Sequence, residues 1–305
     1  MSRILLARRA RGELVRKAQA GLVSLSLDPG VIDGDFGPKT ERAVKRVQRA
    51  QGVEETGAID VPVWIAITAS DPPGALDYCL QLTAAFEGHG FRLAQGNFDG
   101  AGITWGIIGF TLKYGGIKTI VERVRRRRQQ LVEQAFGSRA ATLLEMLARP
   151  LAERIAWAGS ISIGASKARL SKPWRDAFER FGGLPEVQQE QLRLAEQDYF
   201  RPARATARRH KLDSLLGLAL AFDIHVQNGG IKARARDKIA KELAARRVAA
   251  ERDRRILIAL AVADSASPRW RDDVRSRKLT IASGAGRVHE RTYVLENWGL
   301  GEEPA

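Results

Sequence analysis

Residues 86–110 read Phe86-Glu-Gly-His-Gly-Phe-Arg-Leu-Ala-Gln-Gly-Asn-Phe-Asp-Gly-Ala-Gly-Ile-Thr-Trp-Gly-Ile-Ile-Gly-Phe110. Two acidic side chains in this stretch, Glu87 and Asp99, have very different neighbours. Glu87 ends an apolar helical stretch, whereas Asp99 lies in a Gly-rich segment with the hydroxyl of Thr104 five residues further on. Glycine is used where the backbone bends sharply or a ligand must come close. We therefore expect a helix ending at Glu87, a turn that carries Asp99, and a buried β-strand over 104–110.

The two carboxyl groups suit acid–base chemistry on a sugar. Hydrolysis of a glycosidic bond needs one carboxyl group to protonate the leaving oxygen and a second to activate water or attack carbon. Different surroundings assign the two roles. Glu87, beside Phe86 at an apolar helix end, is expected to be the acid, and Asp99, in a polar turn, the base. The alternative is that both belong to a solvated surface, since the chain has 35 acidic residues.

The same stretch resembles the lysozyme-like superfamily, in particular its chitosanase-like branch and the phage lysozymes. The run from Asp99 to Phe110 is very similar to the chitosanase motif Asp-Gly-x-Gly-x-Thr-x-Gly-Ile-Ile-Gly-Phe. The resemblance implies that Glu87 is the general acid, that Asp99 activates water and that the Thr104 hydroxyl positions this water, with inversion at carbon. The gap between the two acids is shorter than in the chitosanases and nearer to that of the phage lysozymes.

A second patch, Phe222-Asp-Ile-His-Val-Gln-Asn-Gly-Gly230, looks like another motif of the chitosanase-like branch. The resemblance implies that Asp223 belongs to a charge network with arginines. The residues expected to contact substrate are His89, Trp105, Asp223, Gln227 and Asn228. His89 has a second interpretation as an exposed side chain, and His225 is interpreted as a packed core histidine.

A separate pattern occupies the N-terminal part of the chain. The run Asp33-Gly-Asp-Phe-Gly-Pro-Lys-Thr40 predicts a tight turn followed by a helix, since Asp-Gly and Phe-Gly pairs suit the turn and Pro38 suits the first helical turn. With a helix before it and Trp64 after it, the segment 14–68 closely resembles the three-helix peptidoglycan-binding module. The residues of the module pattern are Asp33, Phe36, Thr40, Gln48 and Trp64.

Two other interpretations of this segment remain. One is a generic small helical bundle. The other is a calcium loop around Asp33 and Asp35, but an EF-hand needs a closing Glu at position twelve, where Val44 stands. No metal and no cofactor are expected.

Length and composition fit two domains, because 305 residues with 44% hydrophobic content can bury one small core and one larger core. We expect a peptidoglycan-binding module over 1–68, a linker over 69–74 and a lysozyme-like catalytic domain over 75–305. The fold class is mainly α, with a three-helix module and an α+β domain that has a small β-hairpin at the active site. Helices are expected over 117–136, 139–158, 185–200, 212–226 and 232–264, and 212–226 is apolar enough to be buried.

The net charge of +15 fits either nucleic acid or an anionic bacterial envelope. The arginine run 125–128 is interpreted as a solvated helix face, because consecutive helical residues point in different directions. Nucleic-acid motifs of the zinc-finger, RRM and P-loop kinds are absent, so the module favours the envelope and no nucleic acid is expected. The single Cys79 is interpreted as a packed helix residue, and the four histidines lack the His-x-x-x-His spacing of a zinc amidase.

The N-terminal segment and the apolar runs of the chain bear on where the protein is made and where it acts. Residues 1–11 lack the apolar core of a secretory signal, and no apolar run is long enough to span a membrane. We expect synthesis in a host cytoplasm and action in the periplasm or cell wall after release through a holin. A toxin delivered by a secretion machine would use the same chemistry.

These patterns together predict a modular, endolysin-like peptidoglycan hydrolase. It would cleave the β-1,4 bond between N-acetylmuramic acid and N-acetylglucosamine, with the module raising the local substrate concentration. The alternatives are a chitosanase, a lytic transglycosylase that uses Glu87 alone, and a non-catalytic wall-binding or virion protein. The basic segment 270–291 has no assigned role, and the aromatic segment 292–300 is expected to pack against the catalytic domain.

Overall fold

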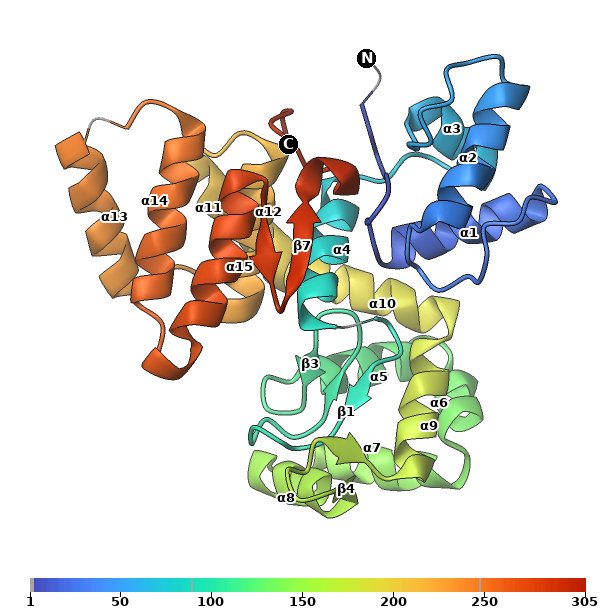
Figure 1. Cartoon of the computed structure of the whole chain (residues 1–305). Coiled ribbons are helices and arrows are strands. Elements are labelled where there is room, and N and C mark those ends of the chain that lie inside the picture. The colour runs from blue at the N-terminus through green and yellow to red at the C-terminus, as the bar shows by residue number, and fades with distance from the viewer. Residues whose placement is uncertain (1–2, 89, 247) are drawn as a thin grey trace. The chain divides into compact units, whose positions relative to one another are not determined.

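The computed structural model describes residues 3–88, 90–246 and 248–305. The chain forms two units, one of Met1–Phe86 together with Tyr199–Ala305 (unit 1) and one of Glu87–Asp198 (unit 2). Helices dominate both units and the strands are short (Figure 1). The mainly α fold class predicted from the sequence is confirmed.

The N-terminal part of unit 1 is a small three-helix module. Its helices are α1 (Glu13–Ser24), α2 (Pro38–Ala50) and α3 (Val61–Thr68). The turn before α2 is held by the buried side chain of Gln19, whose Nε2 donates to Asp33 Oδ1 at 3.0 Å and whose Oε1 accepts from the Gly34 N–H at 2.8 Å. The Asp60 side chain caps α3 by accepting from the Val63 N–H. Local hydrogen bonding thus shapes a module with a small apolar core.

The remainder of unit 1 is built around α12 (Leu215–Asn228). Every residue from Leu215 to Ile224 is buried, and α12 contacts α11 (Arg201–Arg209), α14 (Glu251–Asp264) and α15 (Arg271–Ser283) (Figure 1). The predicted buried helix over 212–226 is therefore present. The other elements are α4 (Ala75–Glu87), α13 (Ala233–Arg246), the 3-10 helices Pro268–Trp270 and Leu295–Trp298, and the antiparallel hairpin of β6 (Ala285–Val288) and β7 (Arg291–Val294).

Unit 2 contains a three-stranded antiparallel sheet in the order β1 (Ala94–Gln95), β2 (Thr104–Trp105), β3 (Phe110–Thr111). Its core is a cluster of aromatic rings in which Trp105 stacks on Phe181 with centroids 5.6 Å apart. The sheet is accompanied by α5 (Gly116–Arg127), α6 (Gln129–Phe136), the 3-10 helix Gly137–Arg139, α7 (Ala140–Ala148), α8 (Leu151–Ile161), the hairpin of β4 (Ser162–Ile163) and β5 (Arg169–Leu170), α9 (Lys172–Gly182), α10 (Pro185–Ala195) and the π-helix Glu196–Phe200.

The predicted single strand over 104–110 is wrong. Strands β2 and β3 are two residues each and are joined by a turn in which Gly106 and Gly109 have φ of 86° and 70°. Side chains other than glycine rarely adopt such angles, so the glycines that suggested a close ligand approach serve the turn. The small β-hairpin expected here is present as β2 and β3, within a three-stranded antiparallel sheet.

Three predicted helices are interrupted. The helix over 117–136 breaks at Arg128, with φ −150° and ψ 75°. The helix over 139–158 breaks at Arg149, which has ψ 161° because the residue before a proline is driven out of the helical region. The stretch 232–264 forms α13 and α14, with Ala250 extended before α14.

Candidate active site

Glu87 is the last residue of α4 and is half-buried. Gly88, at φ 68°, takes the chain out of the helix directly after it. The preceding residue, Phe86, is buried and lies edge-on against Tyr293 with ring centroids 4.9 Å apart. The guanidinium carbon of Arg277 lies 5.1 Å from the Phe86 ring centroid. The helix end that carries Glu87 is therefore held by close packing.

Asp99 lies in the exposed turn between β1 and β2. Its Oδ1 accepts a hydrogen bond from the Ala101 N–H at 2.9 Å, which fixes the carboxyl within its own turn. Asn97 holds the same turn from inside, since its Oδ1 accepts from the Gly102 N–H at 3.0 Å and its backbone N–H donates to Ser162 Oγ at 3.0 Å. The turn is thus attached to the β4 hairpin, so Asp99 is presented to solvent from a defined loop.

Thr104 is the first residue of β2 and is paired with Gln95 and Thr111 across the sheet. The residue is mostly buried, yet within residues 3–88, 90–246 and 248–305 its hydroxyl has no protein hydrogen-bond partner and keeps contact with solvent. A hydroxyl in this state can hold a water molecule. Unit 2 therefore contains Glu87, Asp99 and Thr104, the three residues proposed from the sequence as catalytic.

Trp105 has no exposed surface to offer a substrate, contrary to the sequence-based expectation. It is fully buried, and its Nε1 donates to the Phe178 carbonyl at 3.0 Å. Adjacent residues of a strand point to opposite faces of the sheet. Trp105 therefore points into the aromatic core, and Thr104, its neighbour in β2, points to the other face. His89, also expected near substrate, lies outside the described residues.

Asp223 is fully buried and is the centre of an ion-pair network, so the expectation that it binds substrate is wrong. Arg277 Nη2 lies 2.6 Å from Asp223 Oδ1, and Lys278 Nζ bonds to Asp223 Oδ2. Burial alone would raise the pKa of this carboxyl, but the two cations outweigh it and hold the pKa at about 2. Thr83, one turn before Glu87 on α4, also donates to Asp223 Oδ1, at 3.1 Å. The network thus anchors the helix that carries Glu87.

Gln227 extends this network toward the surface. Lys278 Nζ donates to Gln227 Oε1 at 2.6 Å, and Gln227 Nε2 donates to Asp273 Oδ2 at 2.8 Å. The other Asp273 oxygen lies 2.6 Å from Nε2 of the exposed His289. Asn228, at the end of α12, has a buried Oδ1 without a hydrogen-bond partner in the described part of the chain. Substrate contacts by Gln227 and Asn228 remain a prediction.

The module residues selected from the sequence build the module itself. Four of them are buried: Phe36, Thr40, Gln48 and Trp64. Gln48 joins α2 to the next turn by donating to the Ala58 carbonyl and accepting from the Gly57 N–H, both at 2.9 Å. Asp33 is exposed, and a hydrogen bond from the backbone of Asp35 lowers the pKa of its carboxyl. The four buried side chains thus shape the module rather than facing solvent.

Phe98 is a candidate site residue that the sequence analysis did not single out. Its side chain is 49% exposed in the turn that carries Asp99, although aromatic rings are usually buried. The available signal was its position directly before the candidate base in a glycine-rich loop. An exposed ring beside a carboxylate offers a flat apolar face to a sugar.

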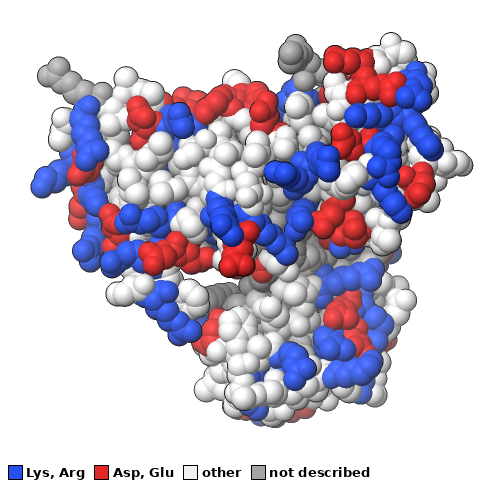
Figure 2. All heavy atoms as spheres, viewed as in Figure 1, with Lys and Arg blue, Asp and Glu red and all other residues white. Residues whose placement is uncertain are grey.

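The basic run 125–128 is partly neutralised by acids. Arg127 Nη1 lies 2.7 Å from Glu190 Oε1, and Arg128 Nη1 lies 2.8 Å from Glu186 Oε1. On the face shown in Figure 2, Lys and Arg side chains alternate with Asp and Glu rather than forming one uninterrupted field. The run is exposed, as the sequence predicts, but it ends α5 instead of continuing one helix face, and Arg127 and Arg128 form ion pairs.

Other chemistries find little support in the described residues. Burial raises the pKa of the Cys79 thiol, which makes it a poor nucleophile. Over residues 3–88, 90–246 and 248–305, no three His, Cys, Asp or Glu side chains form a group that could hold a metal ion. Across the same ranges, every helix is too short or too polar to cross a bilayer.

Residues 11–67 match the sequence model of a family described as "Putative peptidoglycan binding domain". The chain carries a peptidoglycan-binding module. The match covers nearly the same residues as the segment 14–68, which resembles the module in sequence. The comparison with curated proteins gave no match.

Three solved structures of two chitosanases resemble this chain. The native enzyme from Bacillus subtilis MY002 gives a TM-score of 0.50 at 18% identity, over 71% of this chain and 95% of that chain. A mutant of that enzyme complexed with 6 GlcN gives 0.51 at 17% identity with the same coverage. A GH46 chitosanase from Gynuella sunshinyii with chitotetraose gives 0.46 at 21% identity, over 70% and 87%. The two Bacillus comparisons bear out the predicted lysozyme-like fold, and at these identities they show the fold alone.

Proposed function

We propose that this protein is a glycoside hydrolase of peptidoglycan that cleaves the β-1,4 bond between N-acetylmuramic acid and N-acetylglucosamine. One observation carries the proposal: a peptidoglycan-binding module occurs in the same chain as a chitosanase-like fold that presents Glu87 at a helix end and Asp99 in a turn. The module supplies the substrate class, and the two carboxyl groups supply the chemistry.

The proposed mechanism uses the three residues in separate roles. Glu87 donates its proton to the glycosidic oxygen as the bond to the anomeric carbon breaks. Asp99 removes a proton from a water molecule that the Thr104 hydroxyl holds, and this water attacks the carbon from the opposite face. The products are a new reducing end and a free hydroxyl. Asp99 then releases its proton to solvent, and Glu87 takes up a proton from solvent, which restores the starting state.

The exposed turn gives this mechanism a place to hold the sugar. Phe98 offers an apolar face beside Asp99, and the bonds made by Asn97 limit movement of the loop. An inverting route needs the two carboxyl groups about 6.5–9.5 Å apart, with room for water between them, whereas a covalent route needs about 5 Å. We propose inversion.

Chitosan hydrolysis is the second candidate, and the similarity of the fold to Bacillus chitosanases favours it. The peptidoglycan-binding module favours the wall instead. A lytic transglycosylase on the same fold would use Glu87 and tolerate loss of Asp99. We place the enzyme in the class of endolysins, acting on the wall after release from a host cytoplasm through a holin. A secreted toxin would use the same site.

The proposal is tested by dye release from labelled sacculi with Glu87→Gln and Asp99→Asn variants. We expect each variant to lose at least about 100-fold in rate, because each removes one proton-transfer group. Glu122→Gln is the matched control, since Glu122 is a half-exposed acid of unit 2 that pairs with Lys118 on α5. Full activity of Asp99→Asn would contradict the two-carboxylate mechanism. Full activity of Glu87→Gln would contradict the proposal that this protein is a glycoside hydrolase.

A further inference from the structure

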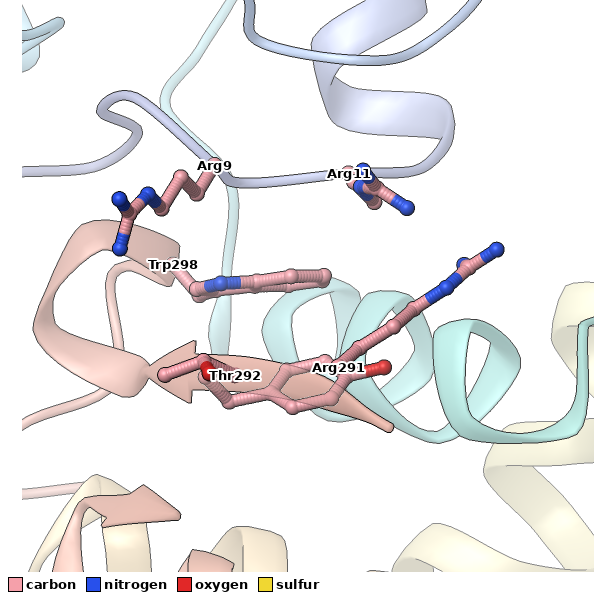
Figure 3. A pocket seen from close by; sticks show the side chains of 6 residues that line it. Arg9, Arg11, Arg291, Thr292 and Trp298 are labelled. Atoms are coloured by element: carbon pink, nitrogen blue, oxygen red, sulfur yellow. The ribbon is translucent and has the colours of Figure 1, made fainter. Parts of the chain in front are cut away.

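A basic pocket lies in unit 1, and its lining includes neither Glu87 nor Asp99. It has a volume of about 330 Å³ and is lined by Arg9, Arg11, Arg291, Thr292, Tyr293 and Trp298. Figure 3 shows that Arg9 and Arg11 come from the N-terminal arm (residues 3–11), that Arg291 and Thr292 come from β7, and that the Trp298 ring lies between them. Two segments from opposite ends of the sequence thus enclose one recess.

The charge of this pocket is unbalanced. Arg11 is paired with Asp35, at 3.0 Å from Nε to Oδ1. In the part of the chain that the structure describes, Arg9 and Arg291 form no ion pair and no side-chain hydrogen bond, and no acid lines the pocket. Like charges that share a recess repel each other, and an anion would relieve this repulsion. The lining therefore favours a negatively charged ligand.

Tyr293 adds a hydrogen-bond donor. Its ring is buried, and within residues 3–88, 90–246 and 248–305 its hydroxyl has no protein partner, yet it is not sealed from solvent. Burial raises the pKa of this phenol, so the group stays protonated at neutral pH, although nearby Arg291 and Arg11 act in the opposite direction. Arginine side chains and a phenol are a common combination for binding an oxyanion.

Hydrogen bonds join the two segments that form the walls of the pocket. The Ala7 N–H donates to the Asn297 carbonyl at 2.8 Å, Asn297 Nδ2 donates to the Arg8 carbonyl at 3.1 Å, and Arg3 Nη2 donates to the Gly299 carbonyl at 3.0 Å. Trp298 packs on Tyr293 with ring centroids 5.4 Å apart. A recess that is already formed loses little entropy when a ligand enters.

We propose that this pocket binds one oxyanion of the bacterial cell wall, a carboxylate or a phosphate, with Arg9 and Arg291 as its charge partners and the Tyr293 hydroxyl as a donor. Two wall components carry such groups: stem peptides carry carboxylates, and anionic glycopolymers carry phosphates. That the oxyanion comes from the cell wall rests on the proposed function, but anion binding by the pocket is independent of glycosidase activity. The ligand would join the N-terminal arm to β7 and add a wall contact of the chain's own.

The test is calorimetric titration of the full chain with soluble probes that contain no glycosidic bond. The probes are a stem tetrapeptide with free carboxylates, the same peptide with its carboxylates amidated, poly(glycerol phosphate) and inorganic phosphate. We expect one anionic probe to bind at one site and the amidated peptide not to bind. Binding of the free peptide assigns a carboxylate, and binding of poly(glycerol phosphate) assigns a phosphate. If only inorganic phosphate binds, or if the amidated peptide binds equally well, the proposal is wrong.

Variants locate the binding. In the double variant Arg9→Gln/Arg291→Gln we expect at least a tenfold weaker Kd. The matched control is Arg125→Gln/Arg126→Gln, which removes the same charge from two exposed arginines on α5 and should bind as the wild type does. Tyr293→Phe removes one hydroxyl without changing charge and should weaken binding severalfold, which keeps the test valid if the double variant fails to fold. Equal losses in the control and the pocket variant would overturn the proposal. The activity of Glu87→Gln on sacculi reports on the proposed function separately.

Discussion

Asp223 illustrates at the residue scale how a buried charge depends on its partners. Replacing it with Asn removes the buried negative charge that Asp223 contributes to Arg277 and Lys278, and we expect the free energy of unfolding at pH 7 to fall by about 3–5 kcal/mol. Urea denaturation measures the change. Asp253→Asn, which removes an exposed acid from α14, is the control and should change the free energy by less than about 0.5 kcal/mol.

The same residue predicts a pH dependence. Its pKa of about 2 in the folded protein lies below the ordinary value of 3.8. The stabilisation is therefore fully present above about pH 4 and is lost as the pH falls through the window down to about 2. Across that window the wild type should lose about 2 kcal/mol more than Asp223→Asn. Parallel pH profiles for the two proteins would contradict the network described for Asp223.

Gly106 is the second residue whose environment makes a sharp prediction. It has φ 86°, and an added Cβ would collide with Gln191 Oε1, the acceptor of the Ile107 N–H. We expect Gly106→Ala to lower the free energy of unfolding by about 2–4 kcal/mol, from strain and overpacking together. Gly100→Ala isolates the strain, since Gly100 has φ 79° and open space around it, and should cost about 1 kcal/mol. Equal losses would show that the collision is absent.

Single residues were also where sequence reasoning failed most clearly. The motif around Thr104 correctly predicted a residue of the small sheet. Its neighbour Trp105 was expected at the substrate because a motif gives residue types without saying which face of the strand each occupies. Asp223 was placed correctly in a charge network, with one arginine and one lysine, but its complete burial depends on helices far away in the sequence. Burial of this kind is a property of the tertiary structure.

At the scale of elements, the turn between β1 and β2 determines how precisely Asp99 is presented. Asn97→Ala removes the hydrogen bonds to the Gly102 N–H and the Ile155 carbonyl. We expect about 1 kcal/mol of lost stability but a fall in kcat/KM of about 10- to 100-fold, because a catalytic group displaced by an ångström loses much of its rate. Dye release from sacculi and urea denaturation give the two values.

Gln129→Ala removes an exposed side chain of α6 and is the control for this change. Asn97→Ala with normal activity would mean that Asp99 needs no support from the turn.

The short strands explain why the sequence predicted this region only roughly. An element of two residues is too short for a period-two pattern, so its ends are set by hydrogen bonds such as those of Asn97.

At the scale of the whole molecule, the net charge of +15 predicts salt-dependent attachment to an anionic wall. We expect the affinity for sacculi of the inactive Glu87→Gln protein to fall severalfold between about 50 and 300 mM NaCl, since salt screens exposed charges beyond about 10 Å at 0.1 M. Co-sedimentation measures the bound fraction, with chitin as an uncharged control. An affinity that stays constant over this range of salt concentration would show that uncharged contacts alone hold the protein on the sacculi.

The module was predictable from sequence because its turn, helix start and core residues lie within a single short segment. Which residues belong to each of the two units was not predictable, because unit 1 joins residues from both ends of the chain. The contacts of Asn297 and Gly299 with the N-terminal arm pair residues almost the full length of the sequence apart. The contiguous boundaries at 1–68, 69–74 and 75–305 stay a prediction.

The most direct test of the central claim is mass spectrometry of the products released from purified sacculi by the wild type and by Glu87→Gln. We predict muropeptides with reducing N-acetylmuramic acid ends from the wild type and none from the variant. Parallel digestion of chitosan should release far less sugar. Anhydro-muramic ends, products from chitosan alone, or equal release by Glu87→Gln would contradict a muramidase that uses Glu87.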